Sequence, residues 1–183
     1  SDVCSSDLSQ LRKAMRRRID LRIVVMGVTS TGKSLMGRML ADALGGTFID
    51  GDDLHPKSNV AKMARGEPLN DMDRAPWLDL VGQRLAQGQG TVVVASSALK
   101  RIYRDRIRKH AGSVIFVHLT GPREVIAERM KAREGHFMPV SLLDSQLATL
   151  EGFAPGEIAV EVDITRPPAR VLGDIMNRLR ALA

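Results

Sequence analysis

The segment VVMGVTSTGKS, residues 24–34, constrains the fold of this chain more than any other segment. Apolar residues run into a turn of small residues, and a lysine and a serine then open a stretch with apolar residues at helical spacing. The turn matches the pattern G-x-x-x-x-G-K-[ST], whose glycines let the backbone curl so that successive N–H groups point inward. The following helix adds the positive end of its dipole. The segment predicts a phosphate-binding loop, with a glycine-rich turn carrying an exposed lysine as the alternative.

The loop predicts binding of a nucleoside triphosphate with Mg²⁺. Lys33 is expected to reach the β- and γ-phosphates, and the hydroxyl of Ser34 is expected to ligate Mg²⁺. The predicted nucleotide-binding residues of the loop are Gly27, Val28, Thr29, Ser30, Thr31, Gly32, Lys33, Ser34 and Leu35. The loop alone does not say whether water, a small molecule or a protein receives the phosphoryl group.

Strand and helix patterns alternate along the rest of the chain, which predicts an α/β fold with a parallel sheet covered on both faces. Strands are expected at 21–26, 47–50, 91–95, 114–119 and 158–164. Helices are expected at 33–44, from 73 to about 87 with Pro76 in the first turn, and at 100–111, 122–133, 140–150 and 168–182. The pattern corresponds to one domain, residues 21–183, preceded by a polar and basic tail, residues 1–20, that is disordered or extraneous.

Composition limits the classes of partner. The formal net charge is +6, which favours anionic ligands, but aromatic residues make up only 3% of the chain and offer little stacking surface for nucleic acid. No apolar run is long enough to span a membrane. The single cysteine, Cys4, cannot form an internal disulfide, which fits the cytoplasm. We therefore expect neither nucleic acid nor a membrane as the main partner.

Three carboxylates follow the second predicted strand, at Asp50, Asp52 and Asp53. In an open parallel sheet, ligands bind beyond the carboxyl ends of the strands, so these acids are expected near the phosphate loop. One of them can support Mg²⁺ through water, and another can accept a hydroxyl proton. The alternative is an acidic turn that caps a helix.

Basic residues in three places are candidates for anion binding. Arg74 lies at a predicted helix start, and Lys100 and Arg104 are spaced i,i+4, so the three together are expected to hold a carboxylate. Arg129 and Arg133 are also spaced i,i+4 and precede a segment bounded by glycine and proline, which suits a mobile lid over the transferring phosphoryl group. The alternatives are exposed salt bridges, a solvated basic face, and cations that suit a helix C-terminus.

The chain resembles bacterial gluconokinases, small-molecule kinases with a phosphate loop that are related in fold to shikimate kinase and adenylate kinase. The resemblance extends from about residue 22 to the C-terminus. It rests on VMGVTSTGKS, DGDDLHPKSNVAKMARGEPLNDMDRAPWL, SSALKRIYRDRIR and AREGHFMPVSLLDSQLATLE, in family order. It implies a three-layer α/β/α fold with a five-stranded parallel sheet and a mobile lid. It also implies ATP-dependent phosphorylation of D-gluconate at its 6-hydroxyl by a cytoplasmic homodimer.

The resemblance also implies roles for residues. Lys33, Asp52 and Arg129 are the expected catalytic residues, with Asp52 accepting or orienting the hydroxyl proton, and Ser34 and Asp50 the expected Mg²⁺ ligands, Asp50 through water. Gluconate is expected to contact Asp52, His55, Arg74, Lys100 and Arg104. Arg129 and Arg133 are expected to close over ATP, and Arg166, in the loop after the last strand, to flank adenine.

The sequence departs from the family pattern at two informative positions. Leu35 stands where threonine is more frequent, which removes a hydroxyl that would contact the α-phosphate, and Ser96 stands where cysteine is common. Two alternative functions stay open at this point. One is a kinase for another small anionic acceptor such as shikimate, and the other is a nucleotide-dependent binding module.

Overall fold

The structure is a computed structural model that describes residues 20–133 and 139–182. The structure contains five strands, and one or two helices separate each strand from the next along the chain. The strands are β1 (Arg22–Met26), β2 (Thr47–Asp50), β3 (Val92–Ala95), β4 (Ile115–Thr120) and β5 (Ile158–Asp163). The helices are α2 (Lys33–Leu44), α3 (Lys57–Ala64), α4 (Asp71–Gln87), α5 (Arg101–Ala111), α6 (Arg123–Ala132), α7 (Val140–Thr149) and α8 (Pro168–Ala181), with a 3₁₀ turn, η1 (Gly51–Leu54).

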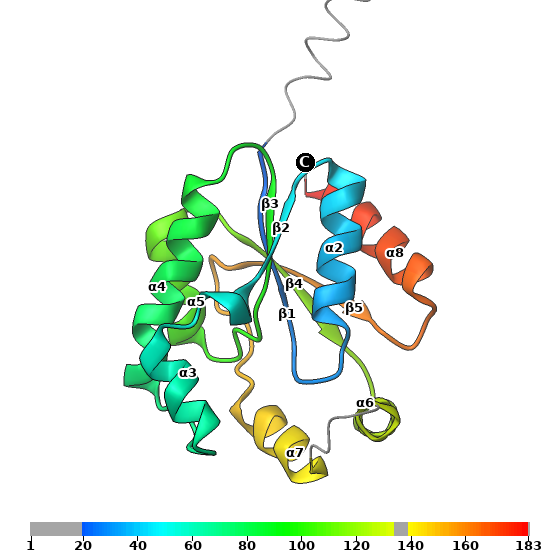
Figure 1. Ribbon diagram of the computed structural model, residues 1–183. Coiled ribbons are helices and arrows are strands. Elements are labelled where there is room, and N and C mark those ends of the chain that lie inside the picture. Colours follow the sequence, from blue (N-terminus) through cyan, green and yellow to red (C-terminus); the bar gives the residue numbers. More distant parts are fainter. Residues whose placement is uncertain (1–19, 134–138, 183) are drawn as a thin grey trace, which may run out of the picture.

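All five strands are parallel and lie in the order β2-β3-β1-β4-β5. The central strand β1 pairs Val24 with Val94 of β3 and with Phe116 of β4. Helices cover both faces of the sheet: α4 and α5 lie on one side, and α2 and α8 on the other (Figure 1). The predicted α/β/α fold with a five-stranded parallel sheet is confirmed.

The alternation of side chains along β1 explains the two layers. Ile23 and Val25 belong to the apolar cluster under α2 and α8, which includes Leu40 and Ile175. Val24 and Met26 belong to the opposite cluster, under α4 and α5. Because both faces of β1 are buried, every residue from 23 to 26 is apolar and fully inaccessible to solvent.

Two local features differ from the sequence-based expectation. Helix α4 begins at Asp71 rather than Asp73, because Asn70 is its N-cap and forms a capping box with Asp73. Pro76 is therefore the sixth residue of α4 and not part of its first turn. Helix α3 was not predicted, because its sequence KSNVAKMA carries no apolar stripe and its one buried residue is Asn59.

The strands end on the same side of the sheet, next to α3, α6 and α7 (Figure 1). The loops that follow β1, β2 and β3 therefore meet at this edge, where an open parallel sheet binds its ligands. Within residues 20–133 and 139–182, no helix is long and apolar enough to cross a bilayer. The predicted tail, apart from Asp20, and the segment 134–138 of the predicted lid lie outside the described residues.

Candidate active site

The loop between β1 and α2 has the curled backbone that its sequence predicts. Gly32 precedes α2 in the left-handed conformation, with φ of 86°, and Ser30 has φ of 61°. Gly27 has no room for a side chain, because a Cβ there would lie 2.7 Å from the carbonyl oxygen of Leu119. The Nζ of Lys33 donates a hydrogen bond of 2.9 Å back to the carbonyl of Val28. The side chain of Lys33 is thus held against its own loop.

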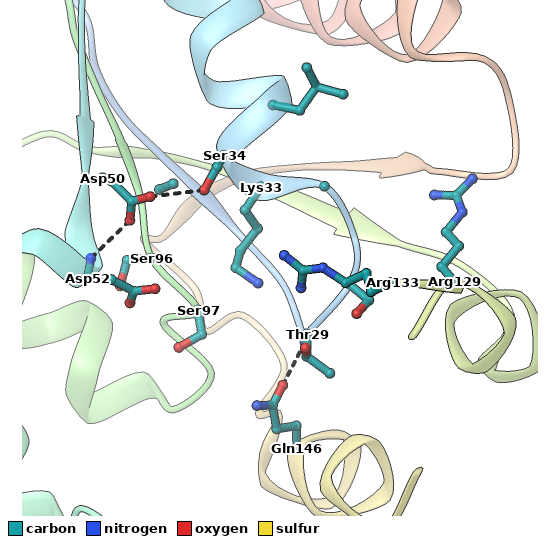
Figure 2. A pocket seen from close by; sticks show the side chains of 14 residues that line it. Thr29, Lys33, Ser34, Asp50, Asp52, Ser96, Ser97, Arg129, Arg133 and Gln146 are labelled. Atoms are coloured by element: carbon teal, nitrogen blue, oxygen red, sulfur yellow. Dashed lines mark hydrogen bonds between the residues drawn. The ribbon is translucent and has the colours of Figure 1, made fainter. Parts of the chain in front are cut away.

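A cavity of about 570 Å³ opens between this loop and the ends of β2 and β3 (Figure 2). The loop contributes Thr29, Ser30, Gly32, Lys33, Ser34 and Leu35 to its lining, and the facing residues are Asp50, Asp52, Ala95, Ser96, Ser97, Arg129, Arg133 and Gln146. Val28 and Thr31 also belong to the loop, but they are buried and do not line the cavity. The cavity therefore brings together the predicted phosphate loop, the predicted acids and the predicted arginines.

Asp50 and Asp52 face the loop from the end of β2. The hydroxyl of Ser34 donates to the carboxylate of Asp50 at 3.1 Å, and the backbone N–H of Asp52 donates to the same carboxylate at 3.1 Å. A serine hydroxyl beside one carboxylate is a donor set that fits Mg²⁺, which uses one or two protein oxygens together with water and phosphate. Asp53 does not line the cavity.

The surroundings shift the protonation of the two central groups. Burial lowers the pKa of Lys33 from 10.5 to about 8, an effect that Asp52 and Asp50 partly offset. Desolvation, followed by the repulsion of Asp50, raises the pKa of Asp52 above its ordinary value. A lysine with a lowered pKa and a carboxylate with a raised pKa are typical of sites that bind anions and transfer protons.

The lowered pKa of Lys33 predicts that nucleotide binding takes up a proton. Bound phosphate favours the ammonium form, so binding raises the pKa of Lys33 above about 8. One unit below that pKa the lysine is already mostly charged, and its contribution to ADP affinity is expected to change little with pH. One unit above it, binding should take up close to one proton and the affinity should fall by several-fold. Calorimetry in buffers of different ionisation enthalpy measures this uptake, and Lys33→Met should abolish it. Equal uptake in that variant would contradict the assignment.

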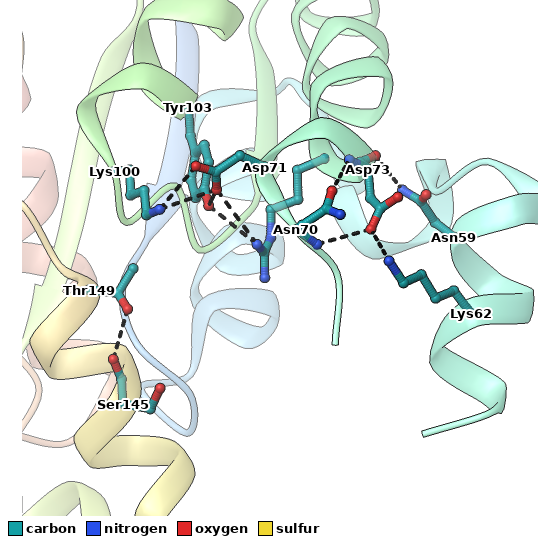
Figure 3. A network of polar contacts seen from close by, with 10 residues as sticks. Asn59, Lys62, Asn70, Asp71, Asp73, Lys100, Tyr103, Ser145 and Thr149 are labelled. Carbon is teal, nitrogen blue, oxygen red and sulfur yellow. Dashed lines mark hydrogen bonds and ion pairs between the residues drawn. The ribbon is translucent and has the colours of Figure 1, made fainter. Parts of the chain in front are cut away.

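A second polar cluster lies at the start of α4 and α5 (Figure 3). The carboxylate of Asp71 accepts hydrogen bonds from the Tyr103 hydroxyl at 2.5 Å and from the Lys100 Nζ at 3.1 Å. Arg74 donates to the Tyr103 oxygen at 3.3 Å and lies 4.0 Å from Asp71. Arg74 and Lys100 are thus brought together as predicted, although neither lines the cavity.

His55 connects the two groups of residues. Its ring stacks on that of Trp77, with centroids 4.2 Å apart, and Trp77 donates its indole N–H to the carbonyl of Gly51. Burial lowers the pKa of His55, and the nearby charges of Asp52 and Arg74 act on it in opposite directions. His55 is therefore held by packing between the acids of the cavity and the basic cluster.

Arg104 does not occupy the open position that its sequence spacing suggests. It has no exposed surface, and it pairs with the carboxylate of Glu157 at 2.7 Å. Its remaining N–H groups donate to the carbonyls of Ala98, Leu99 and Gly152. All donors of the guanidinium are thus satisfied inside the protein, so we correct its expected contact with the acceptor to a structural role that fixes the loop after β3.

The i,i+4 spacing does not place Lys100 and Arg104 together because Lys100 is not helical. It is the N-cap of α5 and has extended backbone angles, φ of −96° and ψ of 147°. The i,i+4 rule applies only when both residues lie in the helix. Lys100 and Arg104 therefore do not share a face.

Replacing Arg104 by methionine is expected to destabilise the fold. Methionine fills similar volume but leaves the buried carboxylate of Glu157 without its partner, which costs about 3 kcal/mol. Urea denaturation measures the loss. As a control, Arg108→Met removes a partly exposed arginine one turn further along α5, and we expect that variant to unfold within about 0.5 kcal/mol of the parent chain. Equal stability of the Arg104 and Arg108 variants would contradict this account.

The predicted arginines of the nucleotide side lie in different environments. Arg129 and Arg133 both line the cavity, and Arg129 also donates to the carbonyl of Ile164 at 2.5 Å. Arg166 pairs with Asp174 at 3.3 Å and does not line the cavity. The predicted lid motif GHFMP falls almost wholly on residues 134–138, outside the described residues.

Four residues that line the cavity were not predicted as site residues from the sequence: Ala95, Ser96, Ser97 and Gln146. Ser97 follows a predicted strand, where ligand-binding residues are expected, but the sequence gives no sign that Ser97 rather than its neighbours is functional. Ser96 is buried, and its hydroxyl has no hydrogen-bond partner in the described part of the chain. Cysteine, which needs no such partner, would suit this position equally well.

Comparisons with known proteins place this geometry in a family. A family model described as an AAA domain matches residues 23–153. The gluconokinase of Gluconobacter oxydans is 44% identical over 163 residues, which cover 87% of this chain and 91% of that protein. The thermosensitive gluconokinase of Escherichia coli is 44% identical over 152 residues, or 81% of each chain. This chain belongs to the gluconokinase family.

Solved structures agree with this assignment. A gluconokinase from Sinorhizobium meliloti is 49% identical, covers 91% of this chain and 95% of its own, and superposes with a TM-score of 0.82. Shikimate kinase from Aquifex aeolicus, at 18% identity and a TM-score of 0.57, shares the fold alone. The suspected resemblance to the gluconokinase family is therefore confirmed, and the chain is a kinase with a phosphate-binding loop.

Proposed function

We propose that this chain transfers the γ-phosphoryl group of ATP to the 6-hydroxyl of D-gluconate, giving 6-phospho-D-gluconate and ADP. The observation that carries the proposal is the cavity in which Lys33 and the loop amides face Asp50 and Asp52 (Figure 2). Membership in the gluconokinase family supports gluconate as the acceptor. Shikimate or another sugar acid is the alternative acceptor.

The loop side of the cavity is suited to the triphosphate. Backbone N–H groups of the loop and the N-terminus of α2 supply fixed positive dipoles, and Lys33 supplies a mobile charge. Mg²⁺ would be held by the Ser34 hydroxyl and, through water, by Asp50. The Ser34 Oγ lies 3.1 Å from the Asp50 Oδ2. When bound, the ion would neutralise phosphate charge. Arg129 and Arg133 face the same space and would stabilise the charge on the transferring group.

The opposite wall is suited to a polyhydroxy acid. The hydroxyl oxygen of the acceptor forms a bond to the γ-phosphorus. At the same time Asp52, whose pKa is raised, accepts the proton of that hydroxyl. The bond from that phosphorus to the β–γ bridging oxygen breaks, and ADP leaves with the electron pair. Arg74 and Lys100, at present paired with Asp71, are the cations available to the substrate carboxylate.

An acceptor panel tests this proposal. ADP release is measured with D-gluconate, other sugar acids, shikimate and no acceptor, each with saturating Mg-ATP. We expect gluconate to accelerate ADP release by at least about 100-fold over the reaction without acceptor, because the attacking hydroxyl is then held in line. A larger rate with shikimate would identify the alternative acceptor. ADP release that no acceptor accelerates would contradict the proposal.

We also infer that the chain acts in the cytoplasm as a homodimer. Use of ATP and the lack of a membrane-spanning helix in residues 20–133 and 139–182 are consistent with that location. The homodimer rests on the family resemblance. Sedimentation velocity of the purified chain distinguishes a dimer from a monomer of 20.0 kDa.

A further inference from the structure

Gln146 is a cavity residue to which neither the sequence pattern nor the proposed mechanism gives a role. It lies on α7, and its side chain lines the cavity together with Lys33, Asp52 and Ser97. Its Oε1 accepts a hydrogen bond of 2.7 Å from the backbone N–H of Thr29, the third residue of the phosphate loop (Figure 2). This bond joins residues 117 positions apart in the sequence. The bond links α7 directly to the phosphate loop.

Chemistry fixes the orientation of this side chain. The N–H of Thr29 can only donate, so the atom facing it must be the carboxamide oxygen, and the Nε2 group must point the other way. In Figure 2 the nitrogen is turned to the side of Ser97, toward the wall that carries Asp52. Nε2 has no hydrogen-bond partner within residues 20–133 and 139–182, so both of its N–H donors are available to a ligand.

The helix that carries Gln146 contacts the rest of the protein through one buried side chain and through hydrogen bonds. Leu143, one turn earlier on α7, is fully buried in the core under α2 and α8. Arg123 of α6 donates two hydrogen bonds to the carboxylate of Asp144, at 2.6 and 2.9 Å. Just past α7, the N–H of Glu151 donates to the carbonyl of Leu99 at 2.8 Å. The carboxamide is therefore placed by a packed element, as the orientation of a substrate requires.

We propose that Gln146 is a further substrate-positioning residue, which anchors on the phosphate loop through Oε1 and holds an oxygen of the acceptor through Nε2. This inference rests on the proposed transfer to a sugar acid. The carboxamide NH₂ of Gln146 is neutral and has two N–H donors. It can therefore bind an oxygen of the anionic acceptor, close to the triphosphate, without adding a negative charge. Because it touches the loop and the acceptor together, it sets the distance between the attacking hydroxyl and the γ-phosphoryl group, to which transfer rates are sensitive.

Two substitutions separate this role from simple support of the loop. Gln146→Met keeps the length of the side chain and removes both hydrogen-bonding groups. Gln146→Glu keeps an acceptor for the Thr29 N–H but replaces the donor by an oxygen that carries charge. Ala148→Ser changes an exposed position on the same helix and serves as the matched control.

We expect kcat/KM for gluconate to fall by about 30-fold or more in Gln146→Met, through both a higher KM and a lower kcat. Gln146→Glu should lose at least as much. ADP affinity and Tm should stay close to those of the parent chain in Gln146→Met, and Ala148→Ser should match the parent in all assays.

The inference fails if Gln146→Met or Gln146→Glu retains the parent kcat/KM for gluconate. It also fails if the loss in Gln146→Met is matched by an equal loss of ADP affinity or by a lower Tm, because Gln146 would then only support the loop. Failure of the parent chain itself to phosphorylate gluconate would instead overturn the proposed function, so the two failures are distinguishable.

Discussion

Replacing Lys33 by alanine is expected to lower kcat/KM for ATP by about 1,000-fold or more. The lysine is the one cationic side chain of the phosphate loop, residues 27–35, and it lines the cavity. Its Nζ donates a hydrogen bond of 2.9 Å to the carbonyl of Val28. Removing a preorganised charge at the transferring group costs about two to three orders of magnitude in turnover alone, and weaker ATP binding adds to this loss. Steady-state kinetics with varied ATP measures the combined effect.

The same substitution should leave the fold nearly unchanged. The carbonyl of Val28 also accepts a hydrogen bond from the Thr31 hydroxyl, so the loss of Lys33 does not leave that group unpaired. Lys57 offers a matched control, because it is the first residue of α3 as Lys33 is the first residue of α2, and it is exposed. Lys57→Ala should retain parent activity. A Lys33→Ala chain with parent kinetics, or one that fails to fold, would contradict the role assigned to the lysine.

Replacing Asp52 by asparagine is expected to lower kcat by roughly 100- to 10,000-fold, the range typical of a lost general base. Asparagine has the same shape but cannot accept the hydroxyl proton. Because desolvation and Asp50 raise the pKa of Asp52, the parent kcat should fall as pH drops through a value above that of an ordinary carboxyl. The pH profile of the residual activity in Asp52→Asn should lack this acid limb.

Nucleotide binding distinguishes a lost base from a damaged site. ADP affinity of Asp52→Asn should stay within about threefold of the parent, because the loop amides and Lys33 are intact. The neighbouring Asp53 is exposed and outside the cavity lining, so Asp53→Asn is the matched control and should keep parent kcat. An Asp52→Asn chain with parent turnover would remove Asp52 as the base.

The sequence predicted the elements that position the phosphate loop. The predicted bounds of α2 and β2 coincide with those observed, because Gly45 ends α2 in a left-handed conformation and TFID is a short extended segment between two turns. The convergence of the loop with Asp50 and Asp52 followed from the rule that parallel strands end at one edge. These features depend on local chemistry and on topology, both of which a sequence pattern carries.

Other features depended on contacts between distant residues, which no local pattern carries. Helix α3 is held by polar bonds, with Asn59 donating to the carbonyl of Asp73 and Lys62 pairing with its carboxylate, rather than by an apolar face. Arg104 meets Glu157 across 53 positions, and Gln146 meets Thr29 across 117. A charged or amide side chain looks the same in a sequence whether it faces substrate or another part of the protein.

The most direct test of the central claim is ³¹P NMR of the parent chain mixed with Mg-ATP and D-gluconate. The account predicts that the γ-phosphate signal is replaced by a phosphate monoester whose phosphorus couples to the two methylene protons at carbon 6, with ADP in equal amount. No ester with gluconate present, or conversion of ATP to inorganic phosphate alone, would contradict it.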